Sequence, residues 1–367
     1  MAPSLIQCAL LGLAASLVVE TSPVSTSGRQ LTHTPAIRNT CEHINYRKSW
    51  NALSDAEKHD YIKAELCLMS HPPITGLVEN ATNVWDEFAN VHITQGNDIH
   101  YVGQFLPWHR YYVRTHELAL QNLCNYTGAH PYWDELTDLS NGNISSSPIF
   151  DPVTGFGGNG TGSNSCVGDG TFKDIVLYMS NHHQRGNEFC LSRDLSQSSF
   201  STEAASNVET CFGYANYTDA WQCYNGNPHS GGHGGVGGLM LDPIDSCNDP
   251  LFFMHHAYLD KLWWEWQMAD LPHRLYDMGG NNTAPQYILD EAGLSQPGAD
   301  ILNYDGDPGS TTTLNHNLWM NWIVANATVG DVMRLNGSVI CAEYVVDERA
   351  RVYNTSVRTD GHYTSEF

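Results

Sequence analysis

The stretch Cys247-Asn-Asp-Pro-Leu-Phe-Phe-Met-His-His-Ala-Tyr-Leu-Asp-Lys-Leu-Trp-Trp-Glu-Trp266 predicts a buried helix with polar groups inside it. Asp249 suits the N-cap, and the proline after it suits the first helical position. The helix is apolar or aromatic on nearly every side, so the His255-His256 pair and Asp260, one turn further on, must be buried with it. Buried imidazoles and carboxylates are costly unless partners satisfy them. A metal ion, with Asp260 orienting its histidine ligand, would satisfy these groups.

Composition limits the partners and the number of domains. The chain has 367 residues, with 17 Lys and Arg against 40 Asp and Glu and a formal charge of -23. This balance disfavours nucleic acids and anionic membranes as partners. The apolar run from Leu5 to Val19 is too short to span a membrane and is typical of a signal peptide. We predict a signal peptide over residues 1–20, one domain over residues 21–367 and no later membrane-spanning segment.

Two further features favour secretion. The chain carries ten cysteines without a Cys-x-x-Cys pair, and nine remain after Cys8 in the predicted signal peptide, so at least one is expected to be unpaired. It also has nine Asn-x-Ser/Thr sequons, which predict N-glycans. They are Asn80, Asn125, Asn143, Asn159, Asn216, Asn281, Asn326, Asn336 and Asn354. We therefore expect a secreted, disulfide-bonded glycoprotein, and the sequence does not determine its oligomeric state.

Two helices are expected before residue 100. Ser54 and Glu57 have the spacing of a capping box, which opens a helix through about Met69. A second helical pattern places His92 on the same face as a set of apolar side chains. These are Val84, Trp85, Phe88 and Val91.

A third helix is predicted from Pro107 to about Cys124, and His109 and His116 share one of its faces. His116 lies roughly 10 Å further along the helix axis, at about 1.5 Å per residue, so it is too far away to share a metal ion with His109. We expect His116 to be a core histidine with its own hydrogen-bond partner.

The middle of the chain is richer in loop residues. Residues 141–170 predict a long loop, with a linker between two domains as the alternative. Further on, His229 and His233 are four residues apart, on one face of a helix if one forms. Gly231 and Gly232 would each cost such a helix about 1 kcal/mol relative to alanine. Shared metal coordination could support the helix, and a flexible His/Gly loop is the alternative.

The C-terminal part changes character. The runs Asp331–Leu335 and Ser338–Val346 flank Asn336-Gly337, which is a hairpin signal. We predict a small β element packed on a mainly α-helical body.

Six histidines on predicted helices or their ends form two groups of three, namely His92, His100 and His109, and His229, His233 and His255 or His256. Imidazole ligands without thiolate or carboxylate suit copper. Two groups predict two metals, each brought by a pair of helices in the core of a four-helix bundle. A single zinc ion held by three histidines is the alternative, but it would leave the other three unexplained.

Two motifs resemble the copper signatures of the tyrosinase, catechol oxidase and haemocyanin family. They are His100-x4-Phe-Leu-Pro-Trp-His109-Arg-x2-Val-x3-Glu117 and Asp249-Pro-Leu-Phe-Phe-x2-His256-x3-Asp260. The segment Pro148-Ile-Phe-Asp-Pro-x2-Gly-Phe-Gly-Gly-Asn-Gly is similar to short secreted fungal members, and the likeness covers roughly residues 41–345.

The resemblance implies a type-3 centre of two copper ions in a four-helix bundle. It assigns His92, His100 and His109 to one copper and His229, His233 and His256 to the other. Arg110 and Glu117 also match the first motif, and we expect both to be structural. Asp98 stands where many members have a cysteine that forms a thioether, so that cross-link is not expected from this position.

The implied activity is that of a polyphenol oxidase, which converts o-diphenols, with o-aminophenols as a further substrate class, to o-quinones with O2. Ser230 follows the first ligand of the second copper, where strong monophenolases often have asparagine, so Ser230 in the substrate pocket favours diphenol oxidation over true tyrosinase activity. His255, or a bound water, could accept the phenolic proton. The alternatives of another class are a haemocyanin-like oxygen carrier and a zinc or degenerate binding module.

Overall fold

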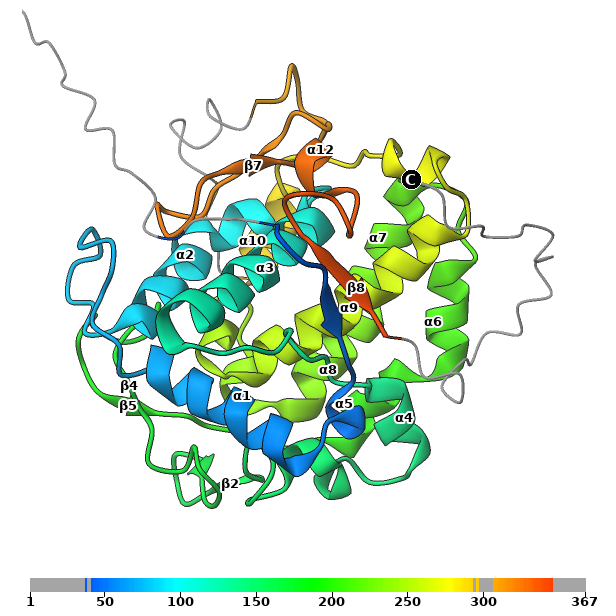
Figure 1. Ribbon diagram of the computed structural model, residues 1–367. Coiled ribbons are helices and arrows are strands. Elements are labelled where there is room, and N and C mark those ends of the chain that lie inside the picture. Colours follow the sequence, from blue (N-terminus) through cyan, green and yellow to red (C-terminus); the bar gives the residue numbers. More distant parts are fainter. Residues whose placement is uncertain (1–36, 38–40, 293–294, 297–305, 346–367) are drawn as a thin grey trace, which may run out of the picture. The chain divides into compact units, whose positions relative to one another are not determined.

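The structure, a computed structural model, describes residues 37, 41–292, 295–296 and 306–345 (Figure 1). The predicted signal peptide, Cys8 and the sequon at Asn354 lie outside these residues. A single cluster of buried apolar side chains runs from Ile37 to Tyr344, and a small second cluster contains Val102. Phe150 and Phe156 belong to the main cluster, so the segment 141–170 packs on this core.

The fold is mainly α-helical, as predicted. The long helices are α1 (Asp55–Leu68), α2 (Val84–Ile99), α3 (Phe105–Cys124) and α9 (Leu251–Met268). The shorter ones are α4 (Glu135–Ser140), α5 (Gln197–Phe200), α6 (Ala205–Phe212), α7 (Tyr217–Gly226), α8 (Pro228–Val236), α10 (Gln286–Ala292) and α12 (Val329–Val332).

The helix starts follow local signals with small offsets. The capping box between Ser54 and Glu57 is present at the start of α1. Helix α3 begins at Phe105, two residues before the predicted start at Pro107, because a proline is tolerated within the first helical turn. Helix α9 begins at Leu251 with Pro250 at its N-cap, one residue later than predicted. Asp249 still accepts a hydrogen bond from the Leu251 N–H, at 2.9 Å.

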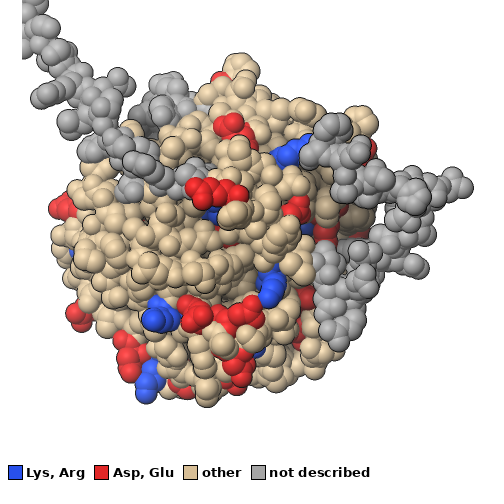
Figure 2. Space-filling view, viewed as in Figure 1, with Lys and Arg blue, Asp and Glu red and all other residues tan. Residues whose placement is uncertain are grey.

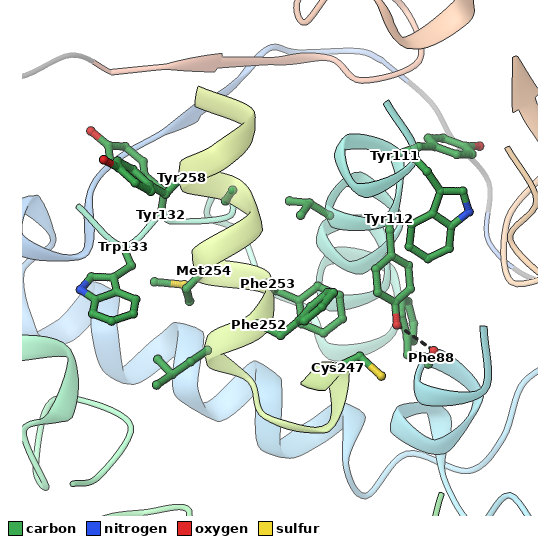
Figure 3. Close-up of a cluster of buried hydrophobic side chains, with 14 of the residues drawn as sticks. Phe88, Tyr111, Tyr112, Tyr132, Trp133, Cys247, Phe252, Phe253, Met254 and Tyr258 are labelled. Atoms are coloured by element: carbon green, nitrogen blue, oxygen red, sulfur yellow. Dashed lines mark hydrogen bonds between the residues drawn. The ribbon is translucent and has the colours of Figure 1, made fainter. Parts of the chain in front are cut away.

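Aromatic side chains fill the space between α9, α3 and α2 (Figure 3). Phe252 and Phe253 point from α9 toward Tyr112 of α3, with ring centroids 5.9 and 5.1 Å from the Tyr112 ring. The Tyr112 hydroxyl donates to the Phe88 carbonyl of α2 at 2.7 Å. On the other side of α9, Met254 lies near Trp133. This packing holds the histidine-bearing helices in register.

Within the described residues, eight short strands form four two-stranded pairs. β1 (Asn45–Arg47) pairs in parallel with β8 (Ala342–Tyr344). The antiparallel pairs are β2 (Gly160–Thr161) with β3 (Cys166–Val167), β4 (Val176–Leu177) with β5 (Phe189–Cys190), and β6 (Asn317–Leu318) with β7 (Ala327–Thr328). A small β element therefore does lie near the C-terminus.

The hairpin predicted at Asn336-Gly337 is wrong. Thr328 and Asp331 form a capping box that starts helix α12, so the first predicted strand is partly helical. The second predicted strand, now β8, pairs with β1 from the other end of the chain (Figure 1).

Four disulfides join eight of the nine cysteines that follow Cys8. They link Cys41 to Cys341, Cys67 to Cys124, Cys166 to Cys190 and Cys211 to Cys223. Cys247 is buried and reduced. The expectation of at least one unpaired cysteine is confirmed.

The surface agrees with the acidic composition. On the face shown in Figure 2, Asp and Glu side chains outnumber scattered Lys and Arg side chains. Among the described residues, no helix combines the length and the apolar composition needed to cross a lipid bilayer.

Candidate metal centre

The first histidine group forms where α2 ends and α3 begins. His92 lies on α2, His100 caps the C-terminus of α2, and His109 lies on α3. One ring nitrogen from each of the three lies within 4.8 Å of those of the other two, and all three side chains are buried. The short connection between the helices thus brings together histidines that the sequence separates by up to 17 positions.

Backbone carbonyls fix the tautomer of all three rings. The Nδ1–H of His92 donates to the carbonyl of Ile244, that of His100 to Gly96, and that of His109 to Phe105, each at 2.8 Å. A carbonyl can only accept, so the proton of the neutral ring is on Nδ1 and Nε2 keeps its lone pair. The buried Nε2 atoms of His92 and His109 have no hydrogen-bond partner among the residues that the structure describes.

The second group lies between α8 and α9. His229 and His233 project from α8, and His255 and His256 from α9, with one ring nitrogen of each within 4.8 Å of the others. The Nδ1–H of His229 donates to Asn225 at 3.2 Å and that of His233 to Met240 at 2.6 Å. Helix α8 does form over the predicted His/Gly segment, so the flexible-loop alternative is excluded.

The two adjacent histidines of α9 have different surroundings. The Nδ1–H of His255 lies 2.6 Å from the carboxylate of Glu135, a partner that the sequence did not indicate. The ring of His256 stacks on His109 of the first group, at 4.2 Å between centroids and 13° between planes. Neither Nε2 atom has a hydrogen-bond partner within the described part of the chain. His256 therefore lies where the two groups meet. His255 lies on the side of the second group that faces Glu135.

Burial keeps these imidazoles neutral. Loss of solvent lowers the pKa of His100 to about 4 and that of His255 to about 3. It lowers the pKa of the other five histidines well below the usual value, and in each of them neighbouring imidazoles lower it further. A neutral imidazole with a free Nε2 lone pair is the form that binds a metal ion, so no proton has to leave before a metal enters.

The donor set fits copper. Both groups consist of imidazoles alone, and five of the rings are held by hydrogen bonds from Nδ1 to backbone carbonyls, as is usual for metal-bound histidine. Buried Nε2 atoms that point at one another would repel unless a cation lay between them. An all-imidazole set without carboxylate or thiolate suits copper. These residues could hold two copper ions, one in each group.

Asp260 does not have the predicted role. Its carboxylate accepts hydrogen bonds from Arg110, from Arg47 at 3.3 Å and from the Tyr344 hydroxyl at 2.7 Å. Two buried guanidinium groups are much stronger attractors for a carboxylate than the weakly acidic N–H of a neutral imidazole. Asp260 therefore ties α9 to α3 and to the β1–β8 pair, and does not orient His256.

Arg110 and Glu117 are structural, as expected. Glu117 lies in the same buried network, where Arg47 and Arg114 donate to it at 2.9 and 2.8 Å. Burial alone would raise the pKa of Glu117, but the two guanidinium groups hold it at about 2. This network ties β1 to α3.

His116 is a core histidine with its own partners, as predicted. Its Nε2 lies 3.2 Å from Glu65, its Nδ1 lies 3.2 Å from Nε2 of His130, and its ring stacks on Phe253 at 3.8 Å. Because both of its ring nitrogens already have hydrogen-bond partners, His116 bridges Glu65 and His130 as a link in a hydrogen-bonded chain.

Ser230, the expected substrate-pocket residue, lies on α8 directly after His229. It is exposed, and His229 is half-buried, so this turn of α8 faces solvent next to the second group. The Ser230 hydroxyl donates to the carbonyl of Asn225 at 3.3 Å.

Comparisons with known proteins agree with this geometry. The family model described as the common central domain of tyrosinase matches residues 82–269, which include every histidine of both groups. A tyrosinase-like protein of Diaporthe leptostromiformis is 30% identical over 342 residues, covering 87% of this chain and 80% of its own. A tyrosinase of Aspergillus flavus is 33% identical over 285 residues, covering 72% of this chain and 74% of its own.

Solved structures give the same fold. A polyphenol oxidase of Thermothelomyces thermophila, solved as a point mutant, superimposes with a TM-score of 0.68 at 27% identity, covering 83% of this chain and 89% of its own. A tyrosinase of Burkholderia thailandensis shares the fold, with a TM-score of 0.55 at 15% identity, covering 83% of this chain and 74% of its own. Together with the family match, these likenesses indicate a copper-binding oxidoreductase, and the chain belongs to the tyrosinase and polyphenol oxidase family.

Proposed function

We propose that this protein oxidises o-diphenols to o-quinones with O2 at a pair of copper ions. The observation that carries the proposal is the meeting of two all-imidazole groups at the His109–His256 contact. Two catechol molecules each give up two electrons and two protons, and one O2 takes them up to give two molecules of water. The copper pair supplies the electron transfer when it is bound.

The proposed ligands follow from the two groups. His92, His100 and His109 hold one copper ion, and His229, His233 and His256 hold the other. His256 is preferred to His255 because its ring also contacts the first group, and two ions that act together must lie close to one another.

Residues of the chain itself select and orient the substrate. A phenol can approach from the exposed turn that carries Ser230, beside half-buried His229. We propose that His255 accepts the phenolic proton, because its Nε2 carries a lone pair and Glu135 stabilises the imidazolium that results.

Diphenols are the proposed substrates, with o-aminophenols as a further class. The Ser230 hydroxyl is occupied by a carbonyl of the preceding turn and is too short to orient a base as an asparagine amide would. An assay of L-tyrosine and L-DOPA side by side tests this. We expect rapid quinone formation from L-DOPA and slow formation, after a lag, from L-tyrosine; rapid turnover of L-tyrosine without a lag would instead establish true tyrosinase activity.

Haemocyanin-like oxygen binding is the alternative of another class. The same histidine groups would serve it, but exposed Ser230 beside the second group favours access by a substrate. Reversible O2 uptake by the copper-loaded protein, without quinone formation from catechol, would favour oxygen carriage. Zinc at the histidine groups would favour a structural role.

We further propose that the protein is secreted and N-glycosylated. Four disulfides are compatible with an oxidising compartment. All eight sequon asparagines within the described residues are exposed. Digestion of the secreted protein with an N-glycosidase should lower its apparent mass, and a mass equal to that of the bare polypeptide would contradict the proposal.

A further inference from the structure

Two carboxyl groups are buried beside His255 and helix α8. Glu135 is the first residue of α4, and Glu203 ends a short 3-10 turn (Ser201–Glu203); neither side chain is exposed. The Glu135 carboxylate lies 2.6 Å from Nδ1 of His255. Within the part of the chain that the structure describes, no lysine or arginine forms an ion pair with either carboxyl.

Two carboxylates in contact in a buried site cannot both be ionised. Burial raises the pKa of both groups well above the usual value, and the proximity of Glu135 raises that of Glu203 further. Glu135 is the one that faces the Nδ1–H of His255, so its carboxyl oxygen is the acceptor in this contact. Glu203 lies beside Glu135 and is not hydrogen-bonded to His255 within the described part of the chain.

The glycines of α8 make room for this arrangement. A Cβ on Gly231 would lie 2.3 Å from a carboxyl oxygen of Glu203, and a Cβ on Gly232 would lie 2.3 Å from Nδ1 of His255 and 3.0 Å from Glu135. Glycine at both positions lets α8 approach these side chains without displacing them. The acid pair, and not metal coordination alone, therefore explains why a helix of the histidine groups contains Gly231 and Gly232.

We infer that Glu135, backed by Glu203, is a positioning residue that holds His255 with its proton on Nδ1 and its Nε2 lone pair facing the second histidine group. Backbone carbonyls hold five of the other histidines in the same tautomer. His255 is held instead by a side chain that substitution can change. The inference rests on the proposed function only for its catalytic consequence.

The first test uses the copper-free protein, so it is independent of enzymatic activity. Long-range 1H–15N NMR of the histidine rings reports which nitrogen carries the proton, and His255→Gln identifies the signals of His255. In the wild type we expect a neutral ring with Nδ1–H. A proton on Nε2, or a doubly protonated ring, at neutral pH would overturn the inference without the need for any further variant.

Two variants separate the roles of the carboxyl groups. Glu135→Leu removes the acceptor, so the proton of His255 should move to Nε2. Glu203→Gln is the matched control: the amide has nearly the size and shape of the carboxyl and leaves the Glu135 acceptor in place, so the Nδ1–H signal should stay. An unchanged tautomer in Glu135→Leu, or an equal disturbance in Glu203→Gln, would overturn the inference.

The copper-loaded proteins supply the second readout. In Glu135→Leu we expect two copper ions per chain, an unchanged KM for 4-tert-butylcatechol and a kcat reduced about 100-fold, the scale on which a positioned proton acceptor contributes. Glu203→Gln should keep most of the wild-type kcat. A wild type that binds no copper or oxidises no catechol would refute the proposed function, whereas an unchanged kcat in Glu135→Leu would refute only the role of Glu135.

Discussion

His109 of α3 and His256 of α9 stack face to face, with 4.2 Å between ring centroids. The ring contacts of His255, by comparison, are with His229, His233 and His256, all in the second group. His256 is therefore the histidine of the second group whose ring contacts the first group.

This difference predicts different copper contents for two neighbouring substitutions. His256→Gln should bind about one copper ion per chain and lose catechol oxidation, because the second ion loses one of its three ligands. His255→Gln should keep two ions and lose mainly kcat. Metal analysis after dialysis against a weak chelator distinguishes them, and loss of copper from His255→Gln alone would reverse the assignment.

The sequence was sufficient for the histidine groups because their signal is local. Helical spacing placed His92 and His109 on apolar faces, and His229 and His233 on one face of a helix, and the structure brings each set together. The role expected for Asp260, to orient the histidine ligand of this helix, failed for a physical reason. The partners of the Asp260 carboxylate are far away in the sequence. Arg47, more than 200 residues away, donates a hydrogen bond to it.

Features that depend on contacts between distant parts of the chain left no pattern in the local sequence from which they could be predicted. The pairing of β8 with β1 joins opposite ends of the chain, whereas the Asn336-Gly337 turn signal favoured a local hairpin. Glu135 and Glu203 lie in polar segments without periodicity, and only the approach of α4, the 201–203 turn and α8 puts them behind His255.

The close approach of α8 predicts that Gly232→Ala will be harmful. Its new Cβ would overlap with His255 and Glu135, and overpacking of this kind costs about 1–3 kcal/mol of unfolding free energy. Gly226→Ala is the control: the described residues leave its Cβ position open, and alanine favours a helix by up to about 1 kcal/mol. Urea unfolding of the copper-free proteins measures both. Equal stability of the two variants would show that α8 can move away.

The buried Glu117 network predicts a loss of stability in acid. The pKa of Glu117 is about 2 in the folded protein against an ordinary value of 4.5, so its contribution is complete above pH 4.5 and is lost as the pH falls toward 2. Glu117→Gln should cost roughly 3–5 kcal/mol at pH 7, because Arg47 and Arg114 lose their buried counter-charge.

Urea unfolding of the wild type and Glu117→Gln at pH 7, 4 and 3 checks this expectation. The difference between the two proteins should shrink as the pH falls. Exposed Glu79→Gln should stay within about 0.5 kcal/mol of the wild type at pH 7. A gap between wild type and Glu117→Gln that is constant from pH 7 to pH 3 would show that the ionised form of Glu117 is not what stabilises the network.

The disulfides should differ in how much they stabilise the protein, according to the length of the chain segment that each one closes. Cys41–Cys341 joins residues 300 positions apart, and Cys211–Cys223 joins residues 12 positions apart. Loop-closure entropy in the unfolded chain predicts that replacing the first pair by serine costs about 6 kcal/mol, and the second about 3 kcal/mol. The long link also holds β1 against β8, and with them Arg47 near Asp260. Urea unfolding of the two double-serine variants under oxidising conditions should therefore rank Cys41→Ser/Cys341→Ser as the less stable, and the opposite ranking would mean that native contacts, not chain closure, determine the contribution of these bonds.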